Sequence, residues 1–138
     1  VKTPTLAGKY SEEFNIYAGP KETLQNSISL FKSVASENGR EEKTLEITTA
    51  CPPVVGLTKE SVDNSLISAA KALIQPEDEI AKNWKDRSYL YGTPEDVVKT
   101  LSMWQEVGIE AVYLQLLDLE QSKRDESVEV IQKAINLL

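Results

Sequence analysis

The sequence contains no histidine and a single cysteine, Cys51. Without histidine, the chain cannot build a histidine-based catalytic triad, a histidine metal site or a histidine haem ligand. One cysteine alone excludes an internal disulfide, a zinc–thiolate cluster and a two-cysteine redox centre within this chain. We therefore expect no metal site, and the sequence assigns no catalytic residue.

Positive charge and long apolar stretches are also scarce. The 138 residues include 15 Lys and Arg against 22 Asp and Glu, which gives a formal net charge of −7. Such a surface disfavours binding to nucleic-acid backbones and to anionic membranes. No apolar run approaches the ~20 residues of a membrane span, and the opening Val1-Lys2-Thr3-Pro4 lacks the apolar stretch of a signal peptide. We expect a cytoplasmic protein that contacts neither nucleic acid nor membrane.

The first half of the chain alternates between helix and strand patterns. Thr3 and Pro4 are typical of a helix start, with Thr3 as N-cap and Pro4 as the first helical residue. A short β-like run follows at residues 13–17. Apolar residues at steps of three and four predict a helix over residues 20–38. A two-residue alternation then predicts a strand over residues 44–50, which two prolines end.

The second half begins with two predicted helices, one capped by Thr58 and one starting at Pro76. Residues 84–91 suggest a partly buried connection. Thr93 and Pro94 then predict a helix, with Thr93 as N-cap. The apolar run from Ala111 to Leu117 is typical of a parallel strand covered on both faces, and a last helix ends the chain.

Strands separated by helices indicate an α/β fold in which the strands pair in parallel through right-handed crossovers. Only three strands are predicted. Three parallel strands leave two open sheet edges, which indicates that the sheet is part of something larger.

The motifs resemble the end of luciferase-like monooxygenases. A helix starts at Gly92-Thr93-Pro94-Glu95, as it does in that family. The turn and last barrel strand of the family are similar to Gly108-Ile109-Glu110-Ala111-Val112-Tyr113-Leu114-Gln115. The continuation Leu116-Leu117-Asp118-Leu119 resembles the deazaflavin-dependent subgroup. Residues 3–15 resemble the helix after the glycine-rich phosphate loop and the strand that follows it. The resemblance covers nearly the whole chain and is least specific over residues 57–91.

This resemblance implies a partial (β/α)8 TIM barrel of about three parallel strands with surrounding helices. Residues 1–138 would form the C-terminal fragment of the barrel domain, since a complete barrel takes about 250 residues. The parent enzyme would be an FMN- or deazaflavin-dependent oxidoreductase or monooxygenase, with the choice of cofactor left open. We expect the fragment to bind no cofactor and to be inactive by itself, and its partner to be the missing N-terminal part of the barrel.

Three residues are candidates for binding the cofactor. Asn15 could orient a flavin or substrate group by hydrogen bonding, or satisfy the backbone at a strand end. Gln115 could point into the barrel mouth, or make a structural hydrogen bond inside the barrel. Thr3 could complete a phosphate site at the first turn of its helix, where the resemblance places the cofactor phosphate, or act as a plain cap.

Other conspicuous residues favour structural roles. Cys51 has no second cysteine to resolve it and is more typical of a small buried residue than of a redox thiol. Trp84, Tyr89 and Tyr91 could line a substrate pocket, but their pattern favours cover of the barrel rim.

An alternative hypothesis belongs to another functional class. The chain could be a stand-alone α/β half-barrel module that acts in binding or assembly and oligomerises through its sheet edges. Two half-barrels can close one sheet and hide both edges. A homo-oligomer is therefore expected for the chain on its own.

Overall fold

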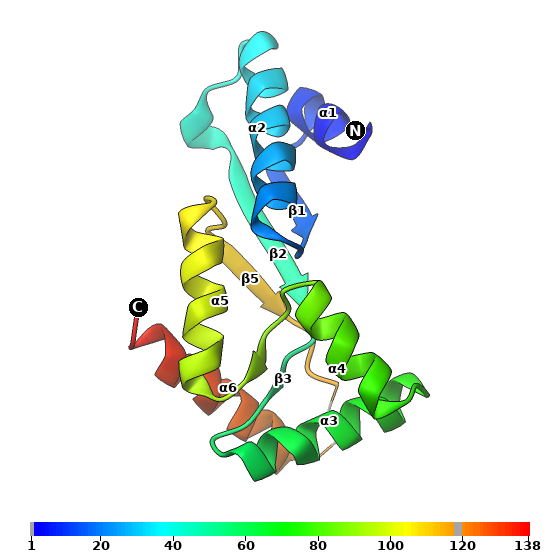
Figure 1. Cartoon of the computed structure of the whole chain (residues 1–138). Helices are drawn as coiled ribbons and strands as arrows, with labels where there is room; N and C mark the ends of the chain where they lie inside the picture. Colours follow the sequence, from blue (N-terminus) through cyan, green and yellow to red (C-terminus); the bar gives the residue numbers. More distant parts are fainter. Residues whose placement is uncertain (1, 118–119) are drawn as a thin grey trace.

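The computed structural model of the chain describes residues 2–117 and 120–138, so Val1, Asp118 and Leu119 of the sequence motifs lie outside the described residues. Helices and short strands alternate along the chain, as Figure 1 shows. Their bounds are α1 Lys2–Tyr10, β1 Glu13–Tyr17, α2 Lys21–Glu37, the 3-10 helix η1 Glu42–Thr44, β2 Glu46–Cys51, β3 Val54–Val55, α3 Lys59–Leu73, α4 Glu77–Asp86, β4 Tyr91–Gly92, α5 Pro94–Glu106, β5 Ala111–Leu114 and α6 Gln121–Ile135.

The main sheet has three parallel strands in the order β1-β2-β5. Asn15 lies opposite Thr48, and Ala50 lies opposite both Tyr17 and Tyr113. The predicted α/β class and the three parallel strands are confirmed. A second pairing, which the sequence pattern did not predict, joins the two-residue strands β3 and β4 in parallel.

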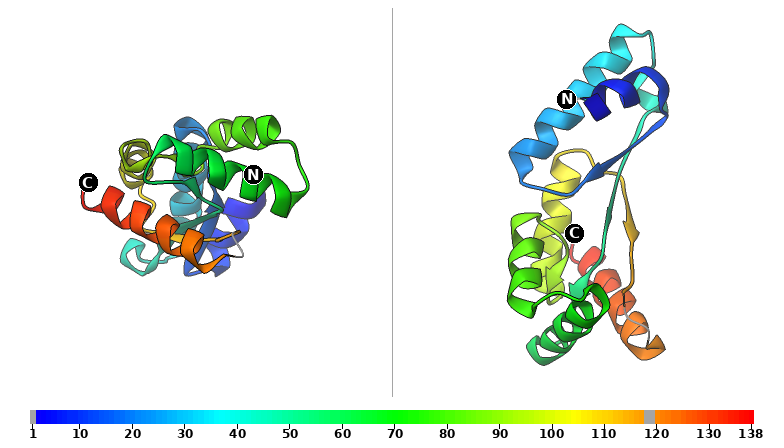
Figure 2. Two further views of the ribbon diagram at one scale, coloured as in Figure 1. Left: turned by 90° about the horizontal axis from the view of Figure 1, so that it is seen from below. Right: turned by 90° about the vertical axis from the view of Figure 1, so that its right-hand side faces the viewer.

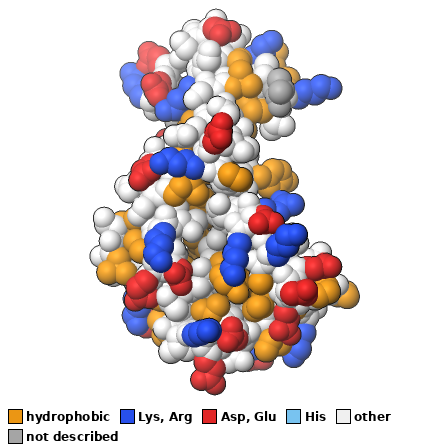
Figure 3. Space-filling view, in the orientation of Figure 1, with side chains coloured by type: hydrophobic (Ala, Val, Ile, Leu, Met, Phe, Trp, Pro, Cys, Tyr) orange, Lys and Arg blue, Asp and Glu red, His pale blue; other side chains and the backbone are white. Residues whose placement is uncertain are grey.

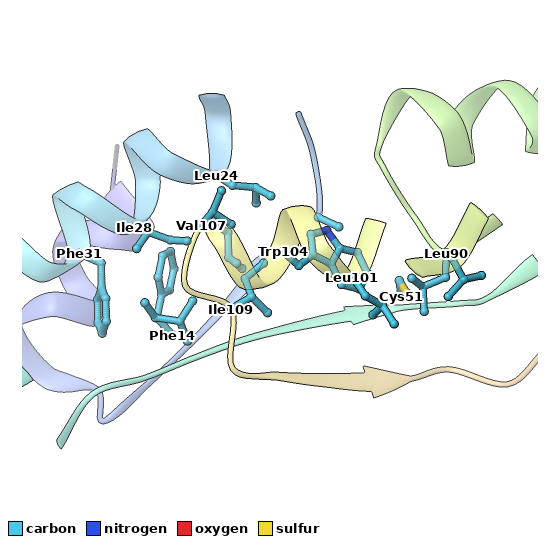
Figure 4. Packing of buried hydrophobic residues seen from close by; sticks show 14 of the residues in the cluster. Phe14, Leu24, Ile28, Phe31, Cys51, Leu90, Leu101, Trp104, Val107 and Ile109 are labelled. Atoms are coloured by element: carbon cyan, nitrogen blue, oxygen red, sulfur yellow. The ribbon is translucent and has the colours of Figure 1, made fainter. Parts of the chain in front are cut away.

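The core lies between the main sheet and the helices on one of its faces, which Figure 2 shows from the side. Phe14 of β1 packs on Phe31 of α2, with ring centroids 4.9 Å apart. Further along, Trp104 of α5 lies in the same cluster as Cys51 and Leu90 (Figure 4). Helix α6 adds three buried side chains to this core: Val130, Ile131 and Ala134. Burial of these apolar side chains fixes which face of the sheet the helices cover.

A second, smaller core lies beyond the C-terminal end of β2. It is formed by residues of β3, α3 and α4: Val54, Ala69, Ala70, Ile80 and Trp84. The indole Nε1 of Trp84 donates a hydrogen bond to the Pro52 carbonyl at 2.7 Å. This bond holds α4 against the turn that follows β2. Residues 84–91, expected to be a connection, therefore include the end of α4 and the start of β4.

Local signals placed most helix starts correctly. Thr58 caps α3, since its Oγ1 accepts a hydrogen bond from the Ser61 N–H at 3.2 Å. Thr93 precedes α5, and Pro94 is its first residue as predicted. The helix predicted at the start of the chain is present as α1, but Thr3 is not its N-cap, because the helix already includes Lys2 and Thr3. Among the described residues, no helix is long and apolar enough to cross a membrane.

The prediction for the last strand needs a correction. β5 ends at Leu114 and not at Leu117, and it is not covered on both faces. Tyr113 is 53% exposed. The reason is that the described helices cover one face of the sheet, so Tyr113 on the other face remains in contact with solvent.

Candidate functional site

The uncovered face of the main sheet is the candidate site, and we call it the open face. Successive side chains of a strand point to opposite faces, and aligned residues of parallel strands share a face. Phe14 and Ile16 point to the core. The open face therefore carries Glu13, Asn15 and Tyr17 of β1, Glu46, Thr48 and Ala50 of β2, and Ala111 and Tyr113 of β5.

Thr48 is at the centre of a hydrogen-bond network on the open face. Its Oγ1 donates to Glu13 Oε1 at 2.5 Å and accepts from Asn15 Nδ2 at 2.9 Å. Thr48 is fully buried beneath these neighbours, although Glu13 and Asn15 are themselves exposed. The hydrogen bond to Thr48 fixes the orientation of the Asn15 amide, and with it the direction in which Asn15 Oδ1 points.

Two tyrosines lie on the open face near the ends of their strands. Tyr17 is 83% exposed. The negative charge of Glu13 raises the pKa of Tyr113, and a hydrogen bond to the Glu13 side chain, slight burial and the charge of Glu46 act in the same direction. Tyr113 is therefore a neutral phenol at physiological pH, able to donate a hydrogen bond.

The structure brings two of the three predicted site residues to this face. Asn15 is part of the network described above. Gln115 follows Tyr113 by two positions, is exposed, and its backbone N–H donates to the Cys51 carbonyl at 3.0 Å. This bond continues the pairing of β5 with β2, so alternation places the Gln115 side chain on the open face as well.

Thr3 lies elsewhere. It is exposed on α1, which packs beside α2 near the end of the sheet where the strands begin (Figures 1 and 2). Tyr17 and Gln115 belong to the opposite end of the strands. Of the three candidate residues, only Asn15 and Gln115 thus share a face.

Of the remaining conspicuous residues, Cys51 and Trp84 are structural, whereas Tyr89 and Tyr91 line a cleft. Cys51 is fully buried, and burial raises the pKa of its thiol to about 11, so it is not the reactive thiolate that redox chemistry needs. Trp84 belongs to the second core, with Tyr89 edge-on to it at 5.4 Å between ring centroids. No group of three or more acidic or cysteine side chains in the described part of the chain could hold a metal ion.

Sequence reasoning missed the residues that organise the open face. Thr48, Glu13 and Tyr113 were not candidates, although each lies in a strand that the sequence predicts. The signal that could have found them is strand alternation combined with register, since Asn15 and Thr48 become neighbours only when β1 and β2 are aligned.

Comparison with solved structures identifies proteins of the same architecture. An F420-dependent secondary alcohol dehydrogenase, solved with an F420-acetone adduct, has 21% sequence identity and a TM-score of 0.67, over 95% of this chain and 45% of that one. EDTA monooxygenase from Chelativorans sp. BNC1 has 14% identity and a TM-score of 0.69, over 97% of this chain and 43% of that one. The coenzyme F420 dependent tetrahydromethanopterin reductase from Methanopyrus kandleri has 14% identity and a TM-score of 0.65, over 97% of this chain and 47% of that one. The chain has the fold of part of each of these proteins.

The resemblance predicted from the sequence motifs is thus confirmed at the level of the fold. The chain spans less than half the length of each of these proteins. No family model matches its sequence, and no curated protein matches it either. At these identities the likeness carries the fold alone.

Proposed function

We propose that the chain forms part of a (β/α)8 barrel oxidoreductase that uses a flavin or a deazaflavin, with the open face turned towards the barrel interior. One observation carries this proposal: a parallel sheet has one face sealed by helices and the other lined by ordered polar side chains. In barrels the strand face away from the helices points inwards, and active sites lie at the C-terminal ends of the strands.

The residues of the open face fit the ring of such a cofactor better than its phosphate. Asn15, Tyr113 and Gln115 offer neutral hydrogen-bonding groups, and Tyr17 offers a flat aromatic surface. The charged side chains there are Glu13 and Glu46, and the described part of this face carries no Lys or Arg. A phosphate therefore has to be held by residues outside this face.

The cofactor, when bound, supplies the hydride-transfer chemistry. The chain itself contributes positioning. Thr48 holds Asn15 in one orientation, and Glu13 raises the pKa of the Tyr113 phenol and accepts a hydrogen bond from it. These groups present fixed donors and acceptors, which lowers the reorganisation needed when a flat polar ring binds.

The binding of FMN and of F420 tests this proposal, first with the chain alone and then with a complete barrel that contains it. We expect weak or no binding to the chain alone, because half of the cradle is absent, and binding to the complete barrel. In that barrel, Asn15→Ala should weaken cofactor binding at least ten-fold. Asn26→Ala, on an exposed position of α2, is the matched control and should leave the affinity unchanged. Tight binding to the isolated chain, or equal effects of the two variants, would contradict the proposal.

A second function is favoured by the two unpaired sheet edges. Within the described residues, β1 and β5 each pair only with β2. A chain of this kind could act as a half-barrel module that assembles with a second copy through these edges. The two functions differ in what completes the sheet: the N-terminal part of an enzyme barrel or another copy of this chain.

A further inference from the structure

A cleft of about 740 Å³ lies between α3, α4 and α5, apart from the open face. It shares no residue with that face. Its volume is within the range of ~300–1,000 Å³ that is usual for small-molecule sites. In Figure 3, basic and acidic side chains together border a hydrophobic area on the lower half of the visible face. The cleft therefore needs an explanation separate from the proposed barrel function.

The wall of the cleft combines apolar and aromatic surface. It is lined by Val62 of α3, Met103 of α5, and the rings of Tyr89 and Tyr91. Both tyrosines are half-buried, so one part of each ring is fixed by packing while another part faces the cleft. Surfaces of this kind suit a flat apolar or aromatic group.

The charged side chains of the cleft leave an excess of positive charge. Of its three lysines, Lys99 is paired with Asp96 at 3.1 Å. Neither Lys59 nor Lys85 has an ion-pair partner among the described residues, and the Nζ of Lys85 lies 5.3 Å from the centroid of the Tyr91 ring. Against these two lysines stands one further carboxylate of the lining, Asp63. In a chain of net charge −7, this local excess favours an anion.

Hydrogen-bond donors are present next to these lysines. Burial, and then the charge of Asp63, raise the pKa of Tyr91, so its hydroxyl remains a donor at neutral pH. Two carboxylates of the chain already lie at the start of α5. Asp96 accepts a hydrogen bond from the Thr93 N–H at 3.4 Å, and Glu95 accepts one from the Thr93 hydroxyl at 2.7 Å. An anion in the cleft would thus be recognised by lysine and tyrosine side chains and not by the helix end.

We propose that this cleft binds a small organic anion with a flat aromatic or apolar group. Lys59 and Lys85 supply the positive charge for a phosphate, sulfonate or carboxylate. Tyr89, Tyr91 and Met103 contact the flat group. This site is independent of the open face, so it stands whether or not the proposed function is correct.

Titration of the chain with 1-naphthyl phosphate, followed by NMR, tests this proposal. Met103 is the one methionine of the sequence, so its labelled methyl group reports on the cleft directly. We expect saturable shifts of the Met103 methyl signal and an affinity that weakens as salt is added. The neutral 1-naphthol should bind at least ten-fold more weakly than the phosphate.

Paired charge variants locate the site. The double variant Lys59→Gln with Lys85→Gln should weaken binding of 1-naphthyl phosphate at least ten-fold. The control is Lys71→Gln with Lys82→Gln. It removes, outside the cleft, one exposed lysine from each of the same two helices, and neither lysine has an ion-pair partner in the part of the chain that the structure describes. Equal weakening by both pairs would show only a general charge effect, and an unmoved Met103 signal would place any binding elsewhere. Either result would overturn the proposal.

Discussion

The chemistry of the open face depends on the contact between two side chains from its two edge strands. Glu13 of β1 raises the pKa of Tyr113 of β5, through its charge and through a hydrogen bond. Both side chains belong to the same face, across β2. The phenol therefore serves as a sensitive probe of how the sheet is assembled.

We predict that Glu13→Gln lowers the pKa of Tyr113 towards the ordinary value for tyrosine. The neutral amide removes the negative charge that disfavours the phenolate, while Glu46 continues to raise the pKa slightly. The Cζ chemical shift of Tyr113 in an NMR titration measures this directly. Glu12→Gln is the matched control: it removes the same charge one position earlier, before β1 begins, and should have the smaller effect. If both variants shift the pKa equally, the contact with Glu13 is not the cause.

The buried thiol of Cys51 leads to a prediction about the stability of the fold at alkaline pH. Its thiol has a pKa of about 11 in the folded chain, against an ordinary value of 9.0. The folded chain thus favours the neutral thiol. The contribution of this preference to the free energy of unfolding is complete below about pH 9 and is lost as the pH rises through about 11. Between about pH 8 and about pH 11, the free energy of unfolding should fall by about 2 kcal/mol more for the natural chain than for Cys51→Ala. Urea unfolding at several pH values measures the difference, and parallel curves for the two proteins would refute it.

At the scale of elements, α1 is held to α2 by a close approach at Gly8. A Cβ at this position would lie 2.7 Å from the Phe31 carbonyl oxygen and 2.8 Å from the Val34 Cβ. Gly8→Ala should therefore force α1 away from α2 and lower the free energy of unfolding by about 1 to 3 kcal/mol. Gly19→Ala is the control, since a Cβ there has no neighbour within 4 Å. Chemical denaturation compares the two, and an equally stable Gly8→Ala variant would show that the helices can separate without cost.

Elements that depend on local signals were predicted well from the sequence. The starts of α3 and α5 follow from Thr58, Thr93 and Pro94, whose capping roles need only residues of the same turn. The strands β3 and β4 could not be predicted in this way. Each has two residues, too few for a visible alternation, and they form only because Val54 meets Tyr91, far away in the sequence.

At the scale of the whole molecule, the candidate site was only partly predictable. Asn15 and Gln115 could be named because strand ends are where barrels place their active sites. Thr48 could not, because its role arises from the alignment of β1 with β2, which is a tertiary property. Tyr113 was assigned to a strand covered on both faces, since no local pattern reveals that the helices of this chain seal one face of the sheet and leave the other open.

The open face and the two unpaired edges lead to a prediction about association. Tyr17 is 83% exposed and Tyr113 53% exposed, and exposed sheet edges with apolar neighbours favour pairing with another chain. We predict that the chain self-associates with rising concentration in sedimentation velocity experiments. Tyr17→Ser combined with Tyr113→Ser should weaken this association, whereas Tyr10→Ser should not, because Tyr10 is 79% exposed on α1 and lies outside the open face.

The open face and its edges cannot bind a second copy and the rest of a barrel at the same time. A competition experiment therefore distinguishes the two functions. If the open face and its edges belong inside a barrel, a polypeptide that supplies the other strands will cover them and suppress self-association in a one-to-one complex. If the chain is a module that assembles with its own copies, that polypeptide will leave the homo-oligomer intact. A chain that stays monomeric at all concentrations and ignores the added polypeptide would contradict both functions, because neither allows the sheet to remain uncovered.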